Sequence, residues 1–191
     1  MDALFGIMTA FGLSASAGLN AYIPLLMVGV IAHYTDWIKL NPPFDMLANP
    51  LVLIVVGILL IIEMLADKIP AVNHVNDIIQ TGIRPAAGAI IFAASAHAIT
   101  NVHPVIAIIC GLLVSGSVHI VKSAAVRPAV TATTGGTANV PVSIAEDVIA
   151  SVVSILSIVI PVLVAAFLII FIALIIWLLW RRAQRKRLPV P

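Results

Sequence analysis

The sequence predicts an all-α fold, a polytopic membrane helical bundle of about five spans. Hydrophobic residues make up 62% of its 191 residues and charged residues only 9%, whereas about 25% of an average soluble domain is charged. The mean hydropathy is +1.18. Residues 148–180 contain no charge, and a helix needs only about 20 apolar residues to cross the bilayer core. The chain is therefore expected to be an integral membrane protein.

Charged and turn-forming residues divide the chain into the expected elements. One transmembrane bundle is predicted over residues 1–180, with spans at about 4–34, 51–68, 85–100, 104–122 and 148–180, followed by a basic cytoplasmic tail over 181–191. The first span is uncharged but is interrupted by Gly18, Asn20 and Pro24, which predict a broken helix. Residues 69–83 are amphipathic, so they are expected to lie at the membrane surface.

Two local patterns set the later boundaries. Thr100-Asn101-Val102-His103-Pro104 predicts a turn between two antiparallel spans. Ser143 and Glu146 have the spacing of a capping box, which predicts that the last helix begins at Ser143. A helix from there to residue 180 would have about 38 residues and a length of roughly 57 Å. That is too long for one bilayer, so either Pro161 kinks it or residues 143–160 lie along the surface.

The basic tail predicts the orientation of the chain. Five of the ten basic residues lie in the tail, namely Arg181, Arg182, Arg185, Lys186 and Arg187. Basic tails remain in the cytoplasm, so the C-terminus of this multi-pass chain is expected there. Because these residues stop a span, they give no reason to expect nucleic acid as a partner, and the lipid bilayer is the expected one.

Two sequence echoes suggest an internal repeat. Residues 14–24 match residues 131–141 without a gap, with four of eleven positions identical. The tripeptide Arg-Pro-Ala also occurs twice, beginning at Arg84 and at Arg127. Transporters are often built from repeats whose interrupted helices meet at the binding site. The alternative is that small residues recur because they allow close helix packing.

Ionisable residues outside the tail are few and lie within or beside spans. Glu63 and Asp67 are four residues apart and share a helical face. Lys68, Arg84 and Lys122, together with Arg127, fall at junctions opposite the tail, contrary to the positive-inside rule. Because a charge inside a span costs at least about 2.5–3.5 kcal/mol, these groups are expected to converge. They form either salt bridges that fix helix packing or a ligand site.

The expected ligand of such a site is an anion. Four cations against two carboxylates leave a positive surplus, and interrupted helices add N-termini that favour phosphate or carboxylate. His119 precedes Lys122 by three residues and shares its face. The candidate substrate-binding residues are Asn20, Tyr22, Glu63, Asp67, Lys68, Arg84, His119, Lys122 and Arg127. No metal-ligand spacing and no hydrolase, P-loop or dinucleotide motif is present, so neither a metal nor a cofactor is expected.

Several of these segments resemble a known family. They are residues 18–26 (Gly-Leu-Asn-Ala-Tyr-Ile-Pro-Leu-Leu), residues 63–70 (Glu-Met-Leu-Ala-Asp-Lys-Ile-Pro), Asn76-Asp77 and residues 81–88. Together they resemble the bacterial integral membrane proteins grouped as domain of unknown function 4126. The resemblance covers most of the chain. It implies a small protein of the bacterial inner membrane, and it implies no reaction.

Three classes of function therefore remain open. The broken, repeated helices favour a small transporter or flippase for an anionic solute or a lipid phosphate. The second class is a membrane enzyme that acts on a lipid headgroup, with Glu63 or Asp67 as general base. Because no nucleophile or metal set is recognisable, the protein is not expected to be an enzyme. The third class is a structural or accessory subunit whose charges only hold helices together. A bundle of this size is expected to need a homodimer for alternating access.

Overall fold

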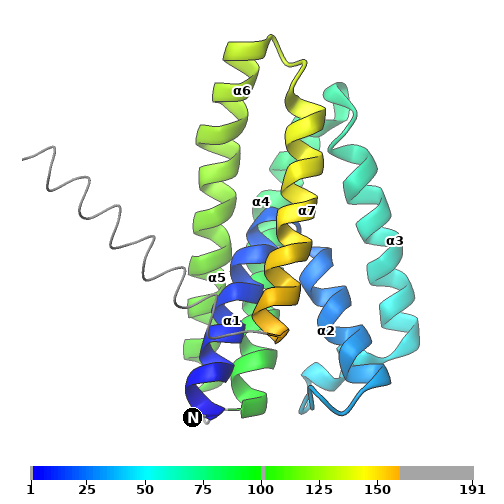
Figure 1. Ribbon diagram of the computed structural model, residues 1–191, viewed down its shortest axis with the longest axis vertical. Coiled ribbons are helices and arrows are strands. Elements are labelled where there is room, and N and C mark those ends of the chain that lie inside the picture. Colours follow the sequence, from blue (N-terminus) through cyan, green and yellow to red (C-terminus); the bar gives the residue numbers. More distant parts are fainter. Residues whose placement is uncertain (1, 100–101, 160–191) are drawn as a thin grey trace, which may run out of the picture.

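All regular structure in the described residues is helical, as the sequence predicts (Figure 1). The computed structural model describes residues 2–99 and 102–159. The elements are α1 (Asp2–Leu19), α2 (Tyr22–Tyr34), the 3-10 helix η1 (Phe44–Ala48), α3 (Pro50–Ala66), α4 (Pro70–Ile99), α5 (Pro104–Val121), the π-helix η2 (Lys122–Val126), α6 (Arg127–Thr134) and α7 (Asn139–Val159). The expected tail over 181–191, the last predicted span beyond residue 159 and the kink at Pro161 lie outside the described residues.

The lengths and composition of these helices are those of a membrane protein. Val75–Ala96, Pro104–Thr134 and Asn139–Val159 are each long and apolar enough to cross a bilayer. Three shorter apolar helical segments accompany them, Gly6–Leu19, Tyr22–Tyr34 and Pro50–Ala66. The first expected span is folded into two of these short helices, and Pro50–Ala66 corresponds to the second expected span.

The segment expected as one interrupted span at 4–34 turns back on itself. α1 rises from the N-terminus to the middle of the bundle, and α2 returns to the same end (Figure 1). The break lies at Asn20 and Ala21, inside the stretch that predicted irregular backbone. Both residues are buried, which satisfies the requirement that non-helical backbone at membrane depth be surrounded by protein or water.

One helix replaces the surface segment expected at 69–83 and the span expected at 85–100. α4 runs without interruption through Pro85. The polar residues of its first half lie on one face, because Asn76, Gln80 and Arg84 are four residues apart, and all three are buried. Their polarity therefore belongs to the interior of the bundle, and the expectation that this segment lies on the membrane surface is wrong.

The span expected at 104–122 is longer than expected, and the last helix begins earlier. α5, η2 and α6 follow one another directly from Pro104 to Thr134. Gly135 and Gly136 then adopt positive φ angles of 62° and 88°, a conformation that glycine adopts at low cost after a helix. This turn lets α7 begin at Asn139, so Ser143 lies inside the helix and does not cap it.

Both copies of the sequence repeat contain the start of a helix, but one copy is buried and the other is exposed. Tyr22 and Asn139 occupy aligned positions and begin α2 and α7, and Pro24 and Pro141 lie in the first turns of those helices. The first break is buried at the centre of the bundle, whereas residues 131–135 are exposed at its tip. The repeat therefore predicts two helix starts, but only the first of them is buried.

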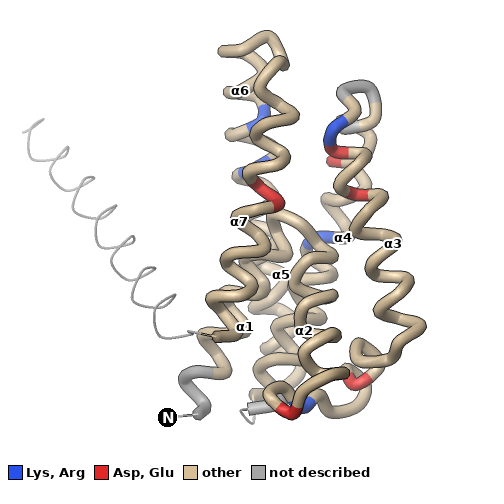
Figure 2. Tube along the Cα trace, turned by 45° about the vertical axis from the view of Figure 1, so that its right-hand side comes forward, with Lys and Arg blue, Asp and Glu red and all other residues tan. Residues whose placement is uncertain are grey.

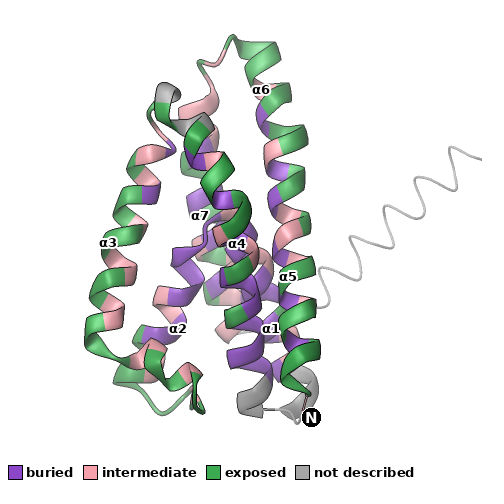
Figure 3. Cartoon of the chain, turned by 180° about the vertical axis from the view of Figure 1, so that it is seen from behind, coloured by how far each residue is buried: buried purple, intermediate pink, exposed green. Residues whose placement is uncertain are grey.

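α1 is the central helix of the bundle, and buried residues concentrate along it (Figure 3). Small residues allow α1, α4 and α5 to approach closely where they meet. Ser14 Oγ donates to Gly111 O at 2.9 Å and lies 3.2 Å from Gly88 O. Small residues and interhelical hydrogen bonds from hydroxyl groups drive helix packing in membrane proteins. The hydrophobic effect does not contribute there, because lipid tails are as apolar as the helix surfaces.

We expect Gly111→Ala to lower the free energy of unfolding by about 1–3 kcal/mol, the usual cost of overpacking a core. An added Cβ would collide with Gly88 O and would lie 2.7 Å from Ala89 Cα and from Phe92 Cβ. Gly57→Ala is the matched control, because nothing lies within 4 Å of an added Cβ there. Thermal unfolding in detergent compares the two. Equal stability of both variants would contradict the close crossing.

Candidate functional site

Charged side chains of the described bundle gather mainly in one interior region. In Figure 2 the charged residues lie mainly along the upper parts of α3, α4, α5–α6 and α7, apart from a few in the loop at the N-terminal end. We call this interior group the charge cluster. Its members are Glu63, Asp67, Lys68, Asp77, Arg84, Lys122, Arg127, Glu146 and Asp147. All six charged residues that were expected to converge are among them.

Asp67 is the hub of the charge cluster. It directly follows the last residue of α3, and its Oδ2 lies 2.9 Å from Arg127 Nη2, 3.5 Å from Arg84 Nη2 and 3.6 Å from Lys122 Nζ. Its Oδ1 accepts from Asn76 Nδ2 at 2.7 Å. Three cations and one amide donor therefore surround this carboxyl group, an arrangement that favours its ionised form.

The arginines of the two Arg-Pro-Ala tripeptides both contact Asp67. Arg84 comes from within α4 and Arg127 from the first residue of α6, and each approaches Asp67 Oδ2. In both places a proline follows the arginine, and proline lacks the N–H that a helix interior would use. The repeated tripeptide thus delivers two guanidinium groups to one carboxylate from different helices.

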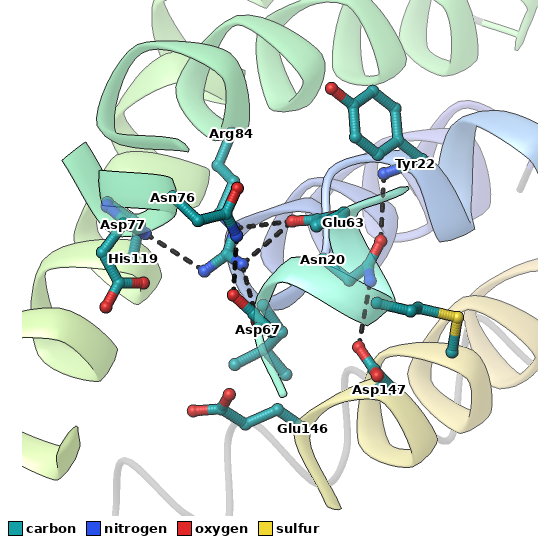
Figure 4. A network of polar contacts seen from close by, with 12 residues as sticks. Asn20, Tyr22, Glu63, Asp67, Asn76, Asp77, Arg84, His119, Glu146 and Asp147 are labelled. Atoms are coloured by element: carbon teal, nitrogen blue, oxygen red, sulfur yellow. Dashed lines mark hydrogen bonds and ion pairs between the residues drawn. The ribbon is translucent and has the colours of Figure 1, made fainter. Parts of the chain in front are cut away.

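Glu63 and Arg84 form the most deeply buried pair of the charge cluster. Both side chains are 0% exposed, and Glu63 Oε1 accepts from Arg84 Nη2 at 2.9 Å and from Nε at 3.2 Å (Figure 4). Glu63 Oε2 has no hydrogen-bond partner among the described residues. Arg84 Nη1 also lies 3.3 Å from His119 Nδ1. The second ring nitrogen of His119 is 3.1 Å from Thr81 Oγ1, so this histidine belongs to the network.

A π-helical turn brings Lys122 and Arg127 onto the same face. In an α-helix, residues five apart point about 140° away from each other, whereas a π turn bonds each residue to the fifth one along. The Arg127 N–H donates to Lys122 O in this manner. Both side chains consequently reach one oxygen, Glu146 Oε2, at 2.9 Å from Lys122 Nζ and 3.0 Å from Arg127 Nη2.

The break between α1 and α2 is connected to the charge cluster. Lys122 Nζ donates to Leu19 O at 2.9 Å, where a helix end has carbonyls without intrahelical partners. Asn20 Oδ1 accepts from the backbone N–H groups of Tyr22 and Ile23, which caps the start of α2. Asn20 Nδ2 donates to Asp147 at 3.0 Å. The broken helix is thus stabilised by the same residues that the sequence proposes as ligand-binding.

The remaining two candidates lie at the edges of the charge cluster. Lys68 Nζ is 3.3 Å from Asp147 Oδ2 and also donates to Met64 O. The Tyr22 side chain is buried and interacts with Gln80 and, through space, with Glu63. The structure therefore brings all nine candidate residues into one connected region.

The charge balance of this region differs from the one expected. Asp77, Glu146 and Asp147 join Glu63 and Asp67, so five carboxylates face the four cations Lys68, Arg84, Lys122 and Arg127. The expected positive surplus is therefore wrong. It arose because Glu146 and Asp147 were assigned to a helix N-terminus, whereas both lie inside α7 and are buried.

Sequence reasoning also left three polar residues of α4 out of the site. Asn76 binds Asp67, Asp77 lies 3.4 Å from Arg127, and Gln80 interacts with Tyr22. Part of their signal was available, since polar residues recur at 76, 80 and 84. A four-residue period marks one face of a helix. Reading that period as a buried face would have found Asn76 and Gln80, but not Asp77.

Two lateral grooves reach the charge cluster, one on each side of α7. The α5–α7 groove has a volume of about 460 Å³, and Val118, Val121, Ala145 and Ile149 are among its lining residues, together with the charged pair Lys122–Glu146. The α3–α7 groove has a volume of about 350 Å³ and is lined by Met64, Ile144 and Val148, among others, together with the pair Lys68–Asp147. The adjacent residues Glu146 and Asp147 of α7 thus serve opposite grooves.

Comparison with known proteins gives one assignment. The family model described as domain of unknown function (DUF4126) matches residues 7–181. The chain belongs to this family. No curated protein and no solved structure gives a significant match. Membership confirms the resemblance of the sequence segments and is consistent with a membrane-embedded helical bundle.

Because the family description includes no reaction, the chemistry must be read from the charge cluster itself. Paired guanidinium and ammonium groups bind carboxylate or phosphate oxygens. Buried ion pairs of this kind also hold helices in register, and breaking one leaves an uncompensated charge. Both uses are compatible with the geometry, and they differ in whether a variant that stays folded loses transport.

Proposed function

We propose that this protein is a small membrane transporter or flippase for an anionic solute or a lipid phosphate, with the charge cluster as its ligand site. The observation that carries the proposal is the convergence of Lys122 and Arg127 on one oxygen of Glu146, which lines a lateral groove together with Lys122. Ionisable groups within membrane spans normally mark substrate or ion pathways. The position of Glu146 Oε2 is where an oxygen of the ligand would bind.

Charge balance requires the ligand to bind by exchange. Four cations already face five carboxylates, so an added anion is accommodated only if it displaces one of them. Glu146 is the natural choice, because Lys122 and Arg127 both point at it and keep Asp67 as a second partner. Displacing Glu146 alters the position of α7, which hydroxyl groups of Thr9 and Ser16 attach to α1.

A structural or accessory role is the second candidate, and the completeness of the ion pairing favours it. Each of the four cations of the charge cluster has a carboxylate within 3.3 Å. In that case the charge cluster joins α3, α4, α6 and α7 and binds no ligand.

We further propose a bacterial inner-membrane location with the tail over 181–191 in the cytoplasm, and a homodimer as the assembly that transports.

The test is transport by the purified full-length chain in liposomes. Entry of labelled inorganic phosphate and transbilayer movement of fluorescent phosphatidic acid are measured separately, against protein-free liposomes. We expect Arg127→Gln to slow the transported species at least about tenfold, since a charged hydrogen bond contributes about 1.5–3 kcal/mol. Arg127→Lys should retain part of the rate, because it keeps the charge but loses the planar fork.

Lys39→Gln is the matched control for Arg127→Gln. It removes one positive charge from an exposed residue in the loop between α2 and η1. Its transport rate should equal that of the unmodified protein. If neither probe moves faster than in protein-free liposomes, or if Arg127→Gln and Lys39→Gln behave alike, the transport proposal is wrong and the accessory role gains support.

A further inference from the structure

We propose that the α5–α7 groove is a binding site for one anionic phospholipid, which enters sideways from the bilayer. In this arrangement an acyl chain lies along the apolar walls, and the phosphate replaces Glu146 on Lys122. The inference rests on the proposed function and deepens it, because it names a membrane lipid, and not a soluble anion, as the ligand of the charge cluster.

The composition of the groove carries this proposal. Val118 and Val121 from α5 and Ala145 and Ile149 from α7 are among the residues that form its walls. Its charged lining groups are Lys122 and Glu146, which are 2.9 Å apart and at least nine-tenths buried. Ligand sites typically measure 300–1,000 Å³ and combine mostly apolar walls with a few well-placed polar groups. At about 460 Å³ the groove is within this range.

The depth of the groove also fits a lipid. Lys122 follows Pro104 by 18 positions, which corresponds to about 27 Å of helix at 1.5 Å per residue. The hydrocarbon core is about 30 Å thick. When Pro104 lies at one surface of the core, Lys122 therefore lies near the opposite headgroup layer. A phosphate at that depth would meet the ammonium group while its acyl chain extends toward the bilayer centre beside Val118.

The repetition of this design beside α3 supports a lipid over a segment of the chain itself. The α3–α7 groove likewise has apolar walls and one lysine–carboxylate pair, Lys68–Asp147. The uncharged residues 160–180 are the competing occupant, since they follow α7 directly. They offer no charge to Lys122 or Glu146, whereas an anionic headgroup does. Of the two occupants, only the phospholipid can therefore take the place of Glu146 on Lys122.

The experiment measures ligand-induced thermal stabilisation of the purified full-length protein in detergent. The probes are a short-chain phosphatidic acid, a phosphatidylcholine with the same chains, and inorganic phosphate. A ligand that binds only the folded state raises Tm in a concentration-dependent way. We expect phosphatidic acid to raise Tm at concentrations at which phosphate has no effect, and phosphatidylcholine to need at least about tenfold more for the same rise.

Two neighbouring substitutions test the groove directly. Val121 lines the groove and is 58% exposed, whereas Ile120 is 61% exposed and does not line it. Val121→Trp fills the groove, so the half-saturating concentration of phosphatidic acid should increase at least about tenfold. Ile120→Trp should leave it unchanged. Because both residues are adjacent and equally exposed, the comparison separates groove filling from a general effect of tryptophan.

Three results would overturn the inference. The first is that phosphatidic acid and phosphate raise Tm equally. The second is that Val121→Trp responds to the lipid like the unmodified protein. The third is that Val121→Trp lowers Tm without any lipid, as expected if residues 160–180 occupy the groove. This assay reads binding without transport. A protein that binds the lipid and moves nothing therefore contradicts only the proposed function, whereas soluble phosphate transport that persists in Val121→Trp contradicts only the lipid site.

Discussion

Arg84→Ala is expected to lower the free energy of unfolding by about 3–5 kcal/mol, the cost of breaking a buried ion pair from one side. The substitution leaves Glu63 with an uncompensated charge at a position where its side chain is 0% exposed. It also removes the neighbour of His119 Nδ1. Urea or thermal unfolding in detergent, followed by circular dichroism, measures the loss.

The double variant Glu63→Gln/Arg84→Gln is the control for this prediction. It removes both charges, so neither side of the pair is left with an uncompensated charge, and replacing a buried pair on both sides costs far less than breaking it from one side. Its stability should therefore be much closer to that of the unmodified protein than the stability of Arg84→Ala. An Arg84→Ala protein that unfolds like the unmodified one would mean that this pair is not buried as described.

Asp67→Asn is expected to have the second large effect, also about 3–5 kcal/mol. The substitution removes the carboxylate that Arg84, Lys122 and Arg127 share at 2.9–3.6 Å. Asp45→Asn is the matched control, because Asp45 is exposed in η1 and is not a member of the charge cluster. Equal stability of the two variants would contradict the role of Asp67 as the hub.

The parts of the fold that could be predicted from the sequence are the membrane helices, because they depend only on whether a segment is apolar enough for the bilayer. Long uncharged segments predict membrane helices, and the residues around Asn20 predict a broken one. The direction of the chain after Asn20 could not be predicted, because a break permits either continuation or reversal. Reversal depends on distant partners, since Lys122 binds Leu19 O and Asp147 binds Asn20. Those contacts join positions more than a hundred residues apart.

The membership of the charge cluster could be predicted in part for a similar reason. A charge in an apolar span is costly wherever it lies, so Glu63, Arg84 and Lys122 stand out by residue type alone. Glu146 was misassigned because the start of α7 depends on the backbone of Gly135 and Gly136, which moves the helix boundary forward. The π turn after Lys122 leaves no comparable sequence signal, yet it determines where Arg127 points.

The most direct test of the central claim, that the charge cluster binds a transported ligand, uses the Glu63→Gln/Arg84→Gln variant. Its unfolding and its transbilayer movement of fluorescent phosphatidic acid are measured on the same liposome preparation. The account predicts a folded protein that has lost most of its transport, because Asp67, which Arg84 then no longer contacts, competes more strongly with the ligand for Lys122 and Arg127. A folded double variant that transports at the unmodified rate would contradict it.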